Sequence, residues 1–160
     1  MPTAIQNQQV VRASLGWMVQ RPTGLVAQAL TSMFTVTGGR ILIRHMYAKL
    51  TIATDASNAT TITVGYTPTE GAGTSAPTAL ASSAVVGVVR EIGTHWVLGA
   101  SVGAILTIGA TAATPLLKPP DQMIGPGVIT YTGGVGVNPG SAAWTLIYTP
   151  IDPGVSVVAN

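Results

Sequence analysis

The sequence contains no cysteine and very little charge, and each shortage excludes a class of protein. Without cysteine the chain forms no disulfide framework and no thiolate metal site, and the redox compartment stays open. Charged residues make up 8% of the 160 residues, against about 25% in an average soluble domain. A small domain with so few charges is poorly protected against association. We therefore expect copies of the chain or a partner to cover much of its outer surface.

The few charges also give no sign of a nucleic-acid or membrane partner. Seven basic and five acidic residues give a net charge of +2, and the basic residues are scattered along the chain rather than clustered along a phosphate-binding path. The uncharged stretch Ile92 to Leu117 is long enough for a membrane-spanning helix of about 20 residues. However, prolines and glycines break a similarly uncharged stretch between Asp121 and Asp152. Since the N-terminal residues also lack the basic and apolar regions of a secretory signal, we expect neither a signal nor a span.

The clearest pattern that is present is an apolar period of two between Thr31 and Pro68. In Thr61–Thr67 large side chains alternate with small or hydroxyl ones, which indicates a strand with one buried face. Gly38-Gly39 predicts a tight turn between two strands. The same alternation returns in Ala143–Thr149, where large apolar side chains occupy every second position. These segments predict neighbouring β-strands.

The segment Arg40–Thr54 changes phase within one strand. Its first two isoleucines occupy odd positions, whereas the later apolar residues occupy even ones: Ile41 and Ile43, then Met46, Ala48, Leu50 and Ile52. Because side chains alternate strictly between the faces of a strand, the switch predicts a β-bulge or bend near Arg44-His45. Long strands that bend in this way are typical of sandwiches and jelly rolls.

Short apolar segments separated by turn signals about every ten residues predict an all-β fold. We expect a jelly-roll-like β-sandwich or barrel of about eight short strands over residues 25–160, with an extended N-terminal arm over residues 1–24. The spacing of Leu25, Ala29 and Met33 allows one helical turn, and prolines and glycines predict a loop from Pro115 to Gly127.

The predicted arm carries apolar residues on either side of polar ones. We assign to it a set of interaction residues: Val10, Val11, Leu15, Trp17 and Met18. Two interpretations stay open. The segment is either a first strand that packs on its own domain, or an arm that docks on a neighbouring subunit by strand addition or by burying a few large side chains.

Three motifs suggest chemistry, and each lacks what the chemistry requires. Gly99–Gly103 matches a nucleophile elbow around Ser101, but both histidines of the chain precede it, whereas that arrangement needs a later one. Gly71–Ala76 resembles a dinucleotide-binding loop, but no helix opens after it. His45 and His95 have no third ligand at metal-binding spacing. We expect no catalytic residue, no cofactor and no metal, and we interpret the sequon at Asn58 as a turn.

The order of several segments resembles small structural proteins of tailed bacteriophages. These segments are Phe34–Ile43, the threonine-rich strand that follows, the loop with Pro77-Thr78, and the ending Ala143–Asp152, so that the resemblance covers roughly residues 30 to 160. It implies a jelly-roll head decoration (cement) protein on the outer surface of the virion capsid. It further implies a homotrimer that bridges neighbouring subunits of the major capsid protein.

The resemblance leaves alternatives open. One is a tail, fibre or host-recognition module of a virion, including a carbohydrate-binding β-sandwich, which would be favoured by Trp17 or Trp96 exposed in a groove. Another is a hydrolase that uses Ser101, although we expect the protein not to be an enzyme.

Overall fold

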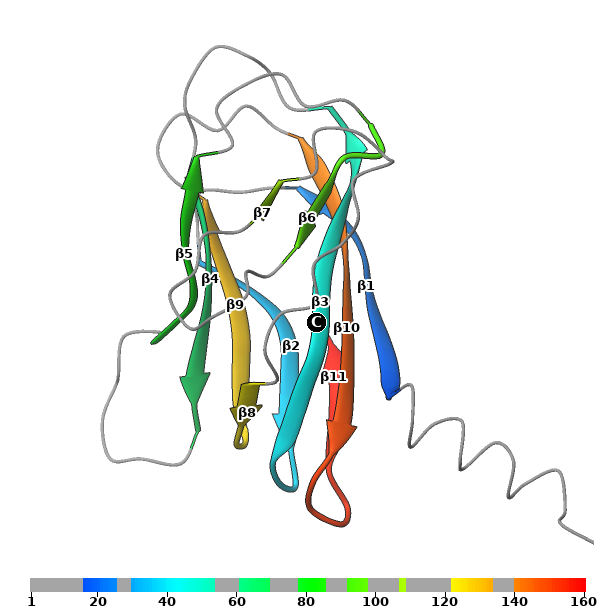
Figure 1. Cartoon of the computed structure of the whole chain (residues 1–160), viewed down its shortest axis with the longest axis vertical. Coiled ribbons are helices and arrows are strands. Elements are labelled where there is room, and N and C mark those ends of the chain that lie inside the picture. The colour runs from blue at the N-terminus through cyan, green and yellow to red at the C-terminus, as the bar shows by residue number, and fades with distance from the viewer. Residues whose placement is uncertain are drawn as a thin grey trace, which may run out of the picture.

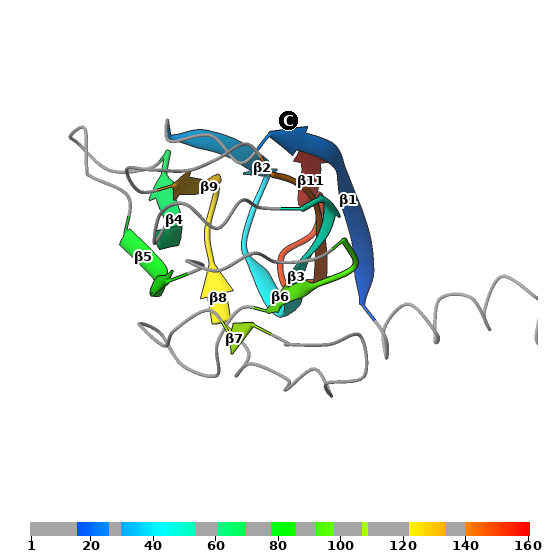
Figure 2. The same cartoon turned by 90° about the horizontal axis from the view of Figure 1, so that it is seen from above.

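The computed structural model describes eight stretches of the chain, which together hold eleven strands. The described residues are 16–25, 30–53, 61–69, 78–85, 92–97, 107–108, 122–133 and 140–160. Within them all regular structure is β, so the predicted all-β class is confirmed. Figures 1 and 2 show two sheets packed face to face.

The first sheet has six strands in the order β1-β10-β3-β6-β7, and β8 also pairs with β3. Its strands are β1 (Trp17–Leu25), β3 (Ile41–Ile52), β6 (His95–Val97), β7 (Thr107–Ile108), β8 (Gln122–Ile124) and β10 (Ser141–Pro150). The second sheet has five strands in the order β11-β2-β9-β4-β5. Its strands are β2 (Thr31–Thr37), β4 (Thr61–Pro68), β5 (Thr78–Val85), β9 (Gly127–Gly133) and β11 (Ser156–Ala159).

The order of the strands is that of a jelly roll. All described pairings are antiparallel, and β1 pairs with β10, β2 with β9, β3 with β6, and β4 with β5. The chain therefore crosses between the two sheets at every step from β1 to β4, and its later strands return beside the earlier ones. This nesting is how two Greek keys form a double-sheet jelly roll. Strands β7, β8 and β11 are additions to this frame.

The bulge predicted in the long strand is confirmed. In the pairing of β3 with β10, His45 lies opposite Ile147 and Ile43 lies opposite Tyr148, so that Arg44 is the extra residue. The residue inserts once into the ladder and reverses the phase of the side chains. For this reason Ile43 and Met46 both face the core although their positions differ in parity.

Aromatic side chains fill the space between the sheets. Trp144 from β10 stacks on Tyr131 from β9 at a centroid distance of 6.0 Å, and Trp96 from β6 lies 6.4 Å from Trp144. Aliphatic side chains of β2, β3 and β4 surround them and are almost fully buried. The alternation expected in β4 and β10 is therefore real: each of these strands turns one face to this core.

Three local expectations need correction. Strand β2 covers Thr31–Thr37, so a helical turn that reaches Met33 is wrong where the structure describes it. Gln122–Ile124 was expected in a loop but forms β8, which pairs with Ile41–Ile43. Strand β1 begins at Trp17, so the boundary proposed at residue 24 falls inside a strand of the sandwich.

Candidate interaction surface

Strand β1 forms one margin of the first sheet and carries the most exposed aromatic residue of the described chain. Trp17 is 46% exposed and Met18 is 60% exposed. Together with Gly16, Val19 and Tyr148 they line a groove of about 250 Å³, which we call the β1 groove. The ring of Trp17 lies 6.4 Å from that of Tyr148, tilted by 41°. The groove thus joins an exposed apolar rim to a buried aromatic floor.

Gly16 fixes how the chain enters this groove. Its φ is +87°, and a Cβ atom there would lie 2.9 Å from the carbonyl oxygen of Tyr148. A side chain is therefore excluded both by the left-handed backbone and by the close approach to β10. Gly16 therefore lies at the edge of the groove, held close to β10.

Strand β1 also links the two sheets along one margin of the sandwich. Between Arg21 and Gly24 the pairing of β1 with β10 shifts, which places Pro22 in a bulge at a sheet edge, where proline is tolerated. Arg21 Nε donates a hydrogen bond of 3.0 Å to the backbone carbonyl of Asn160, beside the second sheet. Its guanidinium carbon lies 6.0 Å from the ring centre of Tyr131.

Asn160 anchors this bridge on the second sheet. Its backbone N–H donates to the carbonyl of Met33, and its side-chain amide donates to the Thr35 hydroxyl, both at 3.0 Å. Figure 2 shows β1 and β11 coming together at this margin. The two sheets are thereby linked by Arg21 and Asn160 along the margin formed by β1.

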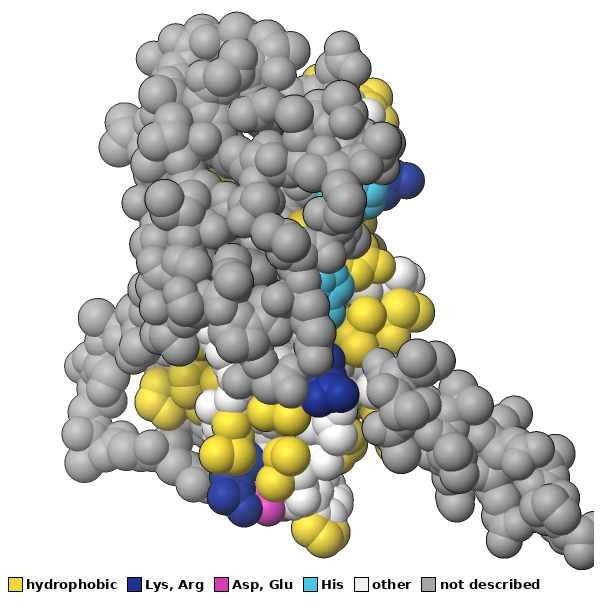
Figure 3. All heavy atoms as spheres, in the orientation of Figure 1, with side chains coloured by type: hydrophobic (Ala, Val, Ile, Leu, Met, Phe, Trp, Pro, Cys, Tyr) yellow, Lys and Arg dark blue, Asp and Glu magenta, His cyan; other side chains and the backbone are white. Residues whose placement is uncertain are grey.

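The two histidines each lie beside Tyr47 on the outer face of the first sheet. The ring of Tyr47 lies 5.6 Å from that of His45 and 6.1 Å from that of His95. Burial lowers the pKa of His45, whose Nδ1 atom is enclosed without a hydrogen-bond partner. Figure 3 shows histidine side chains beside hydrophobic ones on this side. Within the described ranges no three potential ligands gather as a metal site.

A second groove lies at the end of the sandwich where the tight turns meet. It holds about 520 Å³ and is lined by the turn after β2, by Thr69, Pro126 and Asp152. The predicted turn at Gly38-Gly39 packs directly on the turn after β10, since a Cβ atom on Gly38 would lie 2.6 Å from the carbonyl oxygen of Gly154. Nearby, the Tyr66 hydroxyl donates to the Pro126 carbonyl at 2.9 Å.

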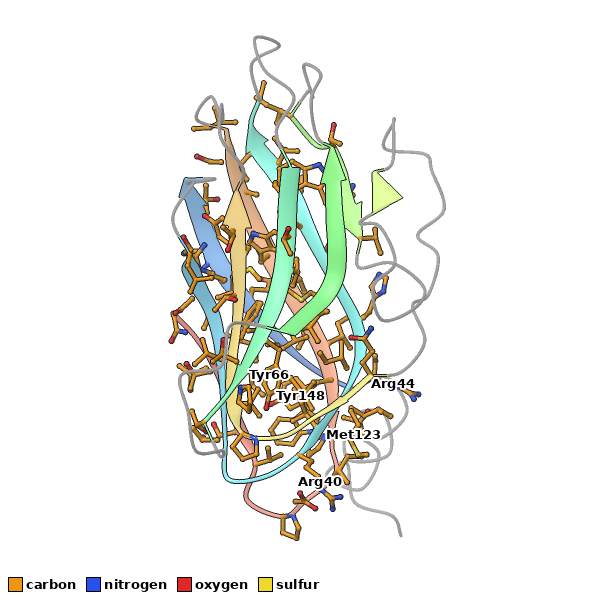
Figure 4. All side chains as sticks on the ribbon, turned by 90° about the vertical axis from the view of Figure 1, so that its left-hand side faces the viewer. Arg40, Arg44, Tyr66, Met123 and Tyr148 are labelled. Carbon is orange, nitrogen blue, oxygen red and sulfur yellow. The ribbon has the colours of Figure 1, made fainter. Side chains whose placement is uncertain are left out.

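One ion pair joins the two turns. Arg40 donates three hydrogen bonds to the carboxylate of Asp152, from its backbone N–H at 2.8 Å, from Nε at 2.9 Å and from Nη2 at 2.8 Å. Figure 4 shows Arg40 at this end, while Arg44 and Met123 extend from the neighbouring side of the sandwich. The pair is solvent-exposed, so it fixes the turns more than it stabilises the fold.

The ion pair between Arg40 and Asp152 leads to a prediction about pH. Hydrogen bonds from Arg40 lower the pKa of Asp152 from 3.8 to about 2. Because the folded-state pKa is depressed, the stabilisation is present above about pH 4 and is lost as the pH falls through the folded-state value near 2. An NMR titration of the Asp152 carboxyl should give a midpoint near 2, and Arg40→Gln should move it upward. An equal midpoint in both proteins would contradict the ion pair.

The structure describes only part of what the sequence singled out. Trp17 and Met18 lie in the β1 groove, whereas Val10, Val11 and Leu15 lie outside the described residues. Ser101, the loop Gly71–Ala76 and Asn58 lie outside them as well. Trp96 and Trp144 are buried, as expected for core residues. The described parts of the chain include no helix long and apolar enough to cross a membrane.

Several residues that build this surface were not found from sequence. Tyr148 was assigned to a strand but not to a groove, and no partner was predicted for Arg21. The available signals were the placement of Arg21-Pro22 and the glycine at position 16. Comparisons of this chain with protein families, with characterised proteins and with solved structures found no match.

Proposed function

We propose that this chain is a virion structural protein that decorates the outer surface of a tailed-bacteriophage capsid and stabilises it by bridging neighbouring major capsid protein subunits. The observation that carries the proposal is the β1 groove. It presents exposed Trp17 and Met18 at the margin of a closed sandwich whose chain is only 8% charged. An apolar rim on a charge-poor surface is suited to permanent contact with other subunits.

The proposed mechanism is mechanical and needs no chemistry. The jelly roll is closed at one margin by Arg21 and Asn160 and at one end by Arg40 and Asp152. Such a body resists deformation when it spans a junction between shell subunits. In a symmetric shell the same contact repeats many times, so that a modest free energy at each site reinforces the whole particle. A homotrimer would place three copies of the sandwich around one junction.

The direct test is binding to shells. Purified protein should co-sediment saturably with empty capsids of the same virus that lack it. DNA-filled capsids decorated with the protein should release their DNA at a higher temperature than undecorated ones. Because the contact is apolar, the binding should persist in high salt. Failure to bind such shells, or binding to host cells instead, would contradict the proposal.

One observation favours a second candidate, a carbohydrate-binding module of a virion tail or fibre. Trp17 is half-exposed and lines a groove, as a sugar-stacking residue does. Trp96 is fully buried and takes no part in such a site. Titration with host-derived glycans distinguishes the two functions: saturable binding that Trp17→Ala abolishes would favour the module over the capsid protein.

A further inference from the structure

We propose that the β1 groove of one copy receives the N-terminal residues of a second copy, with Val10 and Val11 inserted against Trp17 and Tyr148. The inference deepens the proposed function and takes the trimer from it, because it names the contact that would hold the copies together. It rests on where the groove lies, on what the preceding residues contain, and on how far they reach.

The groove is lined for an apolar occupant. Its rim is Trp17 and Met18, its floor is Tyr148, and Val19 packs on the core beneath it. The exposed fractions of 46% and 60% leave large apolar areas in water, and their burial would be favourable. No charged side chain lines it.

Residues 1–15 match this groove in composition. They contain one charged residue, Arg12, and the adjacent pair Val10-Val11. The pair is β-branched, which suits an extended segment laid along a sheet margin. Strand β1 is the terminal strand of its sheet, so an added strand would continue the order of the first sheet.

The geometry favours another copy as acceptor. Gly16 lies at the edge of its own groove, where its backbone is held against Tyr148. Val11 precedes Gly16 by five positions, about 16 Å of extended chain, and would have to reverse direction to return to the same groove. Fifteen extended residues reach roughly 50 Å, which exceeds the diameter of about 40 Å expected for a domain of this length.

The donor and the acceptor are different surfaces of the same molecule. A contact of this kind is head-to-tail, and it either closes into a ring or continues as a filament. In a closed trimer every arm and every groove is used once. Any closed ring shares this property, and the number of three copies comes from the proposed function.

The experiment uses the full chain and measures its mass in solution over a range of concentrations. The arm variant is Val10→Glu/Val11→Glu, and the groove variant is Met18→Glu. The matched control is Met123→Glu, since Met123 on β8 is 59% exposed, almost as much as Met18. Thermal unfolding of each variant verifies that the sandwich is intact.

We expect a trimer for the wild-type chain and for the control. Each of the other two variants should raise the concentration needed for association by at least about tenfold, because a carboxylate enters an apolar contact. An equimolar mixture of the arm and groove variants should form a complex of two chains, since one supplies an intact groove and the other an intact arm.

Three outcomes would overturn the inference: a monomeric wild-type chain, an arm variant that associates like the wild type, or a mixture that does not associate although the wild type does. The shell-binding assay separates this inference from the proposed function. A trimer that does not bind shells would contradict only the proposed function. A monomer that binds shells would contradict only the insertion of the N-terminal residues into a neighbouring groove.

Discussion

Replacing Trp144 with alanine is expected to lower the free energy of unfolding by about 3–5 kcal/mol. The side chain is 2% exposed and lies between Tyr131 and Trp96, at centroid distances of 6.0 and 6.4 Å. Its removal leaves a cavity between two sheets whose strands are held in register, so the surrounding side chains cannot collapse into it fully. Denaturant titration followed by circular dichroism measures the loss.

The control for this prediction is Trp17, which lies at the surface and not in the core. Trp17→Ala should cost less than about 1 kcal/mol, because Trp17 is 46% exposed. Both substitutions belong in the Val10→Glu/Val11→Glu background, so that association does not contribute to the measured stability. Equal losses for the two variants would mean that the aromatic cluster is not the centre of the core.

Deletion of Arg44 is expected to abolish the cooperative fold. Arg44 is the extra residue of the bulge between β3 and β10. Without it, one part of β3 must turn its apolar side chains outward, because a shift of one residue exchanges the two faces of a strand. Exposing only Ile41 and Ile43 would cost on the order of 5 kcal/mol or more, which is comparable with the whole stability of a small domain.

The matched control is Arg44→Ala, which keeps the residue count and removes only the side chain. We expect a loss of about 1 kcal/mol or less and an unchanged cooperative transition. Near-ultraviolet circular dichroism and a thermal scan distinguish the two variants. A deletion variant that melts like the wild type would show that the turn at Gly38-Gly39 absorbs the shift.

The sequence predicted the frame of the fold because the frame depends on strict local patterns. Alternation in β4 and β10, the phase change at Arg44 and the glycine turn are all properties of neighbouring residues. β8 could not be predicted, because its three residues are too few to show the alternation of a strand. The helical spacing at Leu25–Met33 was misleading, since pairing with β9 and β11 overrides a weak local preference.

The candidate surface was predicted only in part. Trp17 and Met18 stood out because large apolar residues are conspicuous in a polar segment. Tyr148 and Gly16 could not be joined to them from sequence, since the pairing of β1 with β10 links residues that lie far apart in the chain. The contact of Arg21 could not be predicted for the same reason, because its partner Asn160 is 139 positions away.

That separation has a consequence for synthesis. Strand β1 is synthesised long before its neighbour β10, since Trp17 pairs with Tyr148. At 5–20 residues per second the wait is on the order of 10 s. During this interval the largely apolar strand β1 stays near the translating ribosome without β10. Slower elongation should lengthen this interval, and with it the time for which β1 lacks its neighbour.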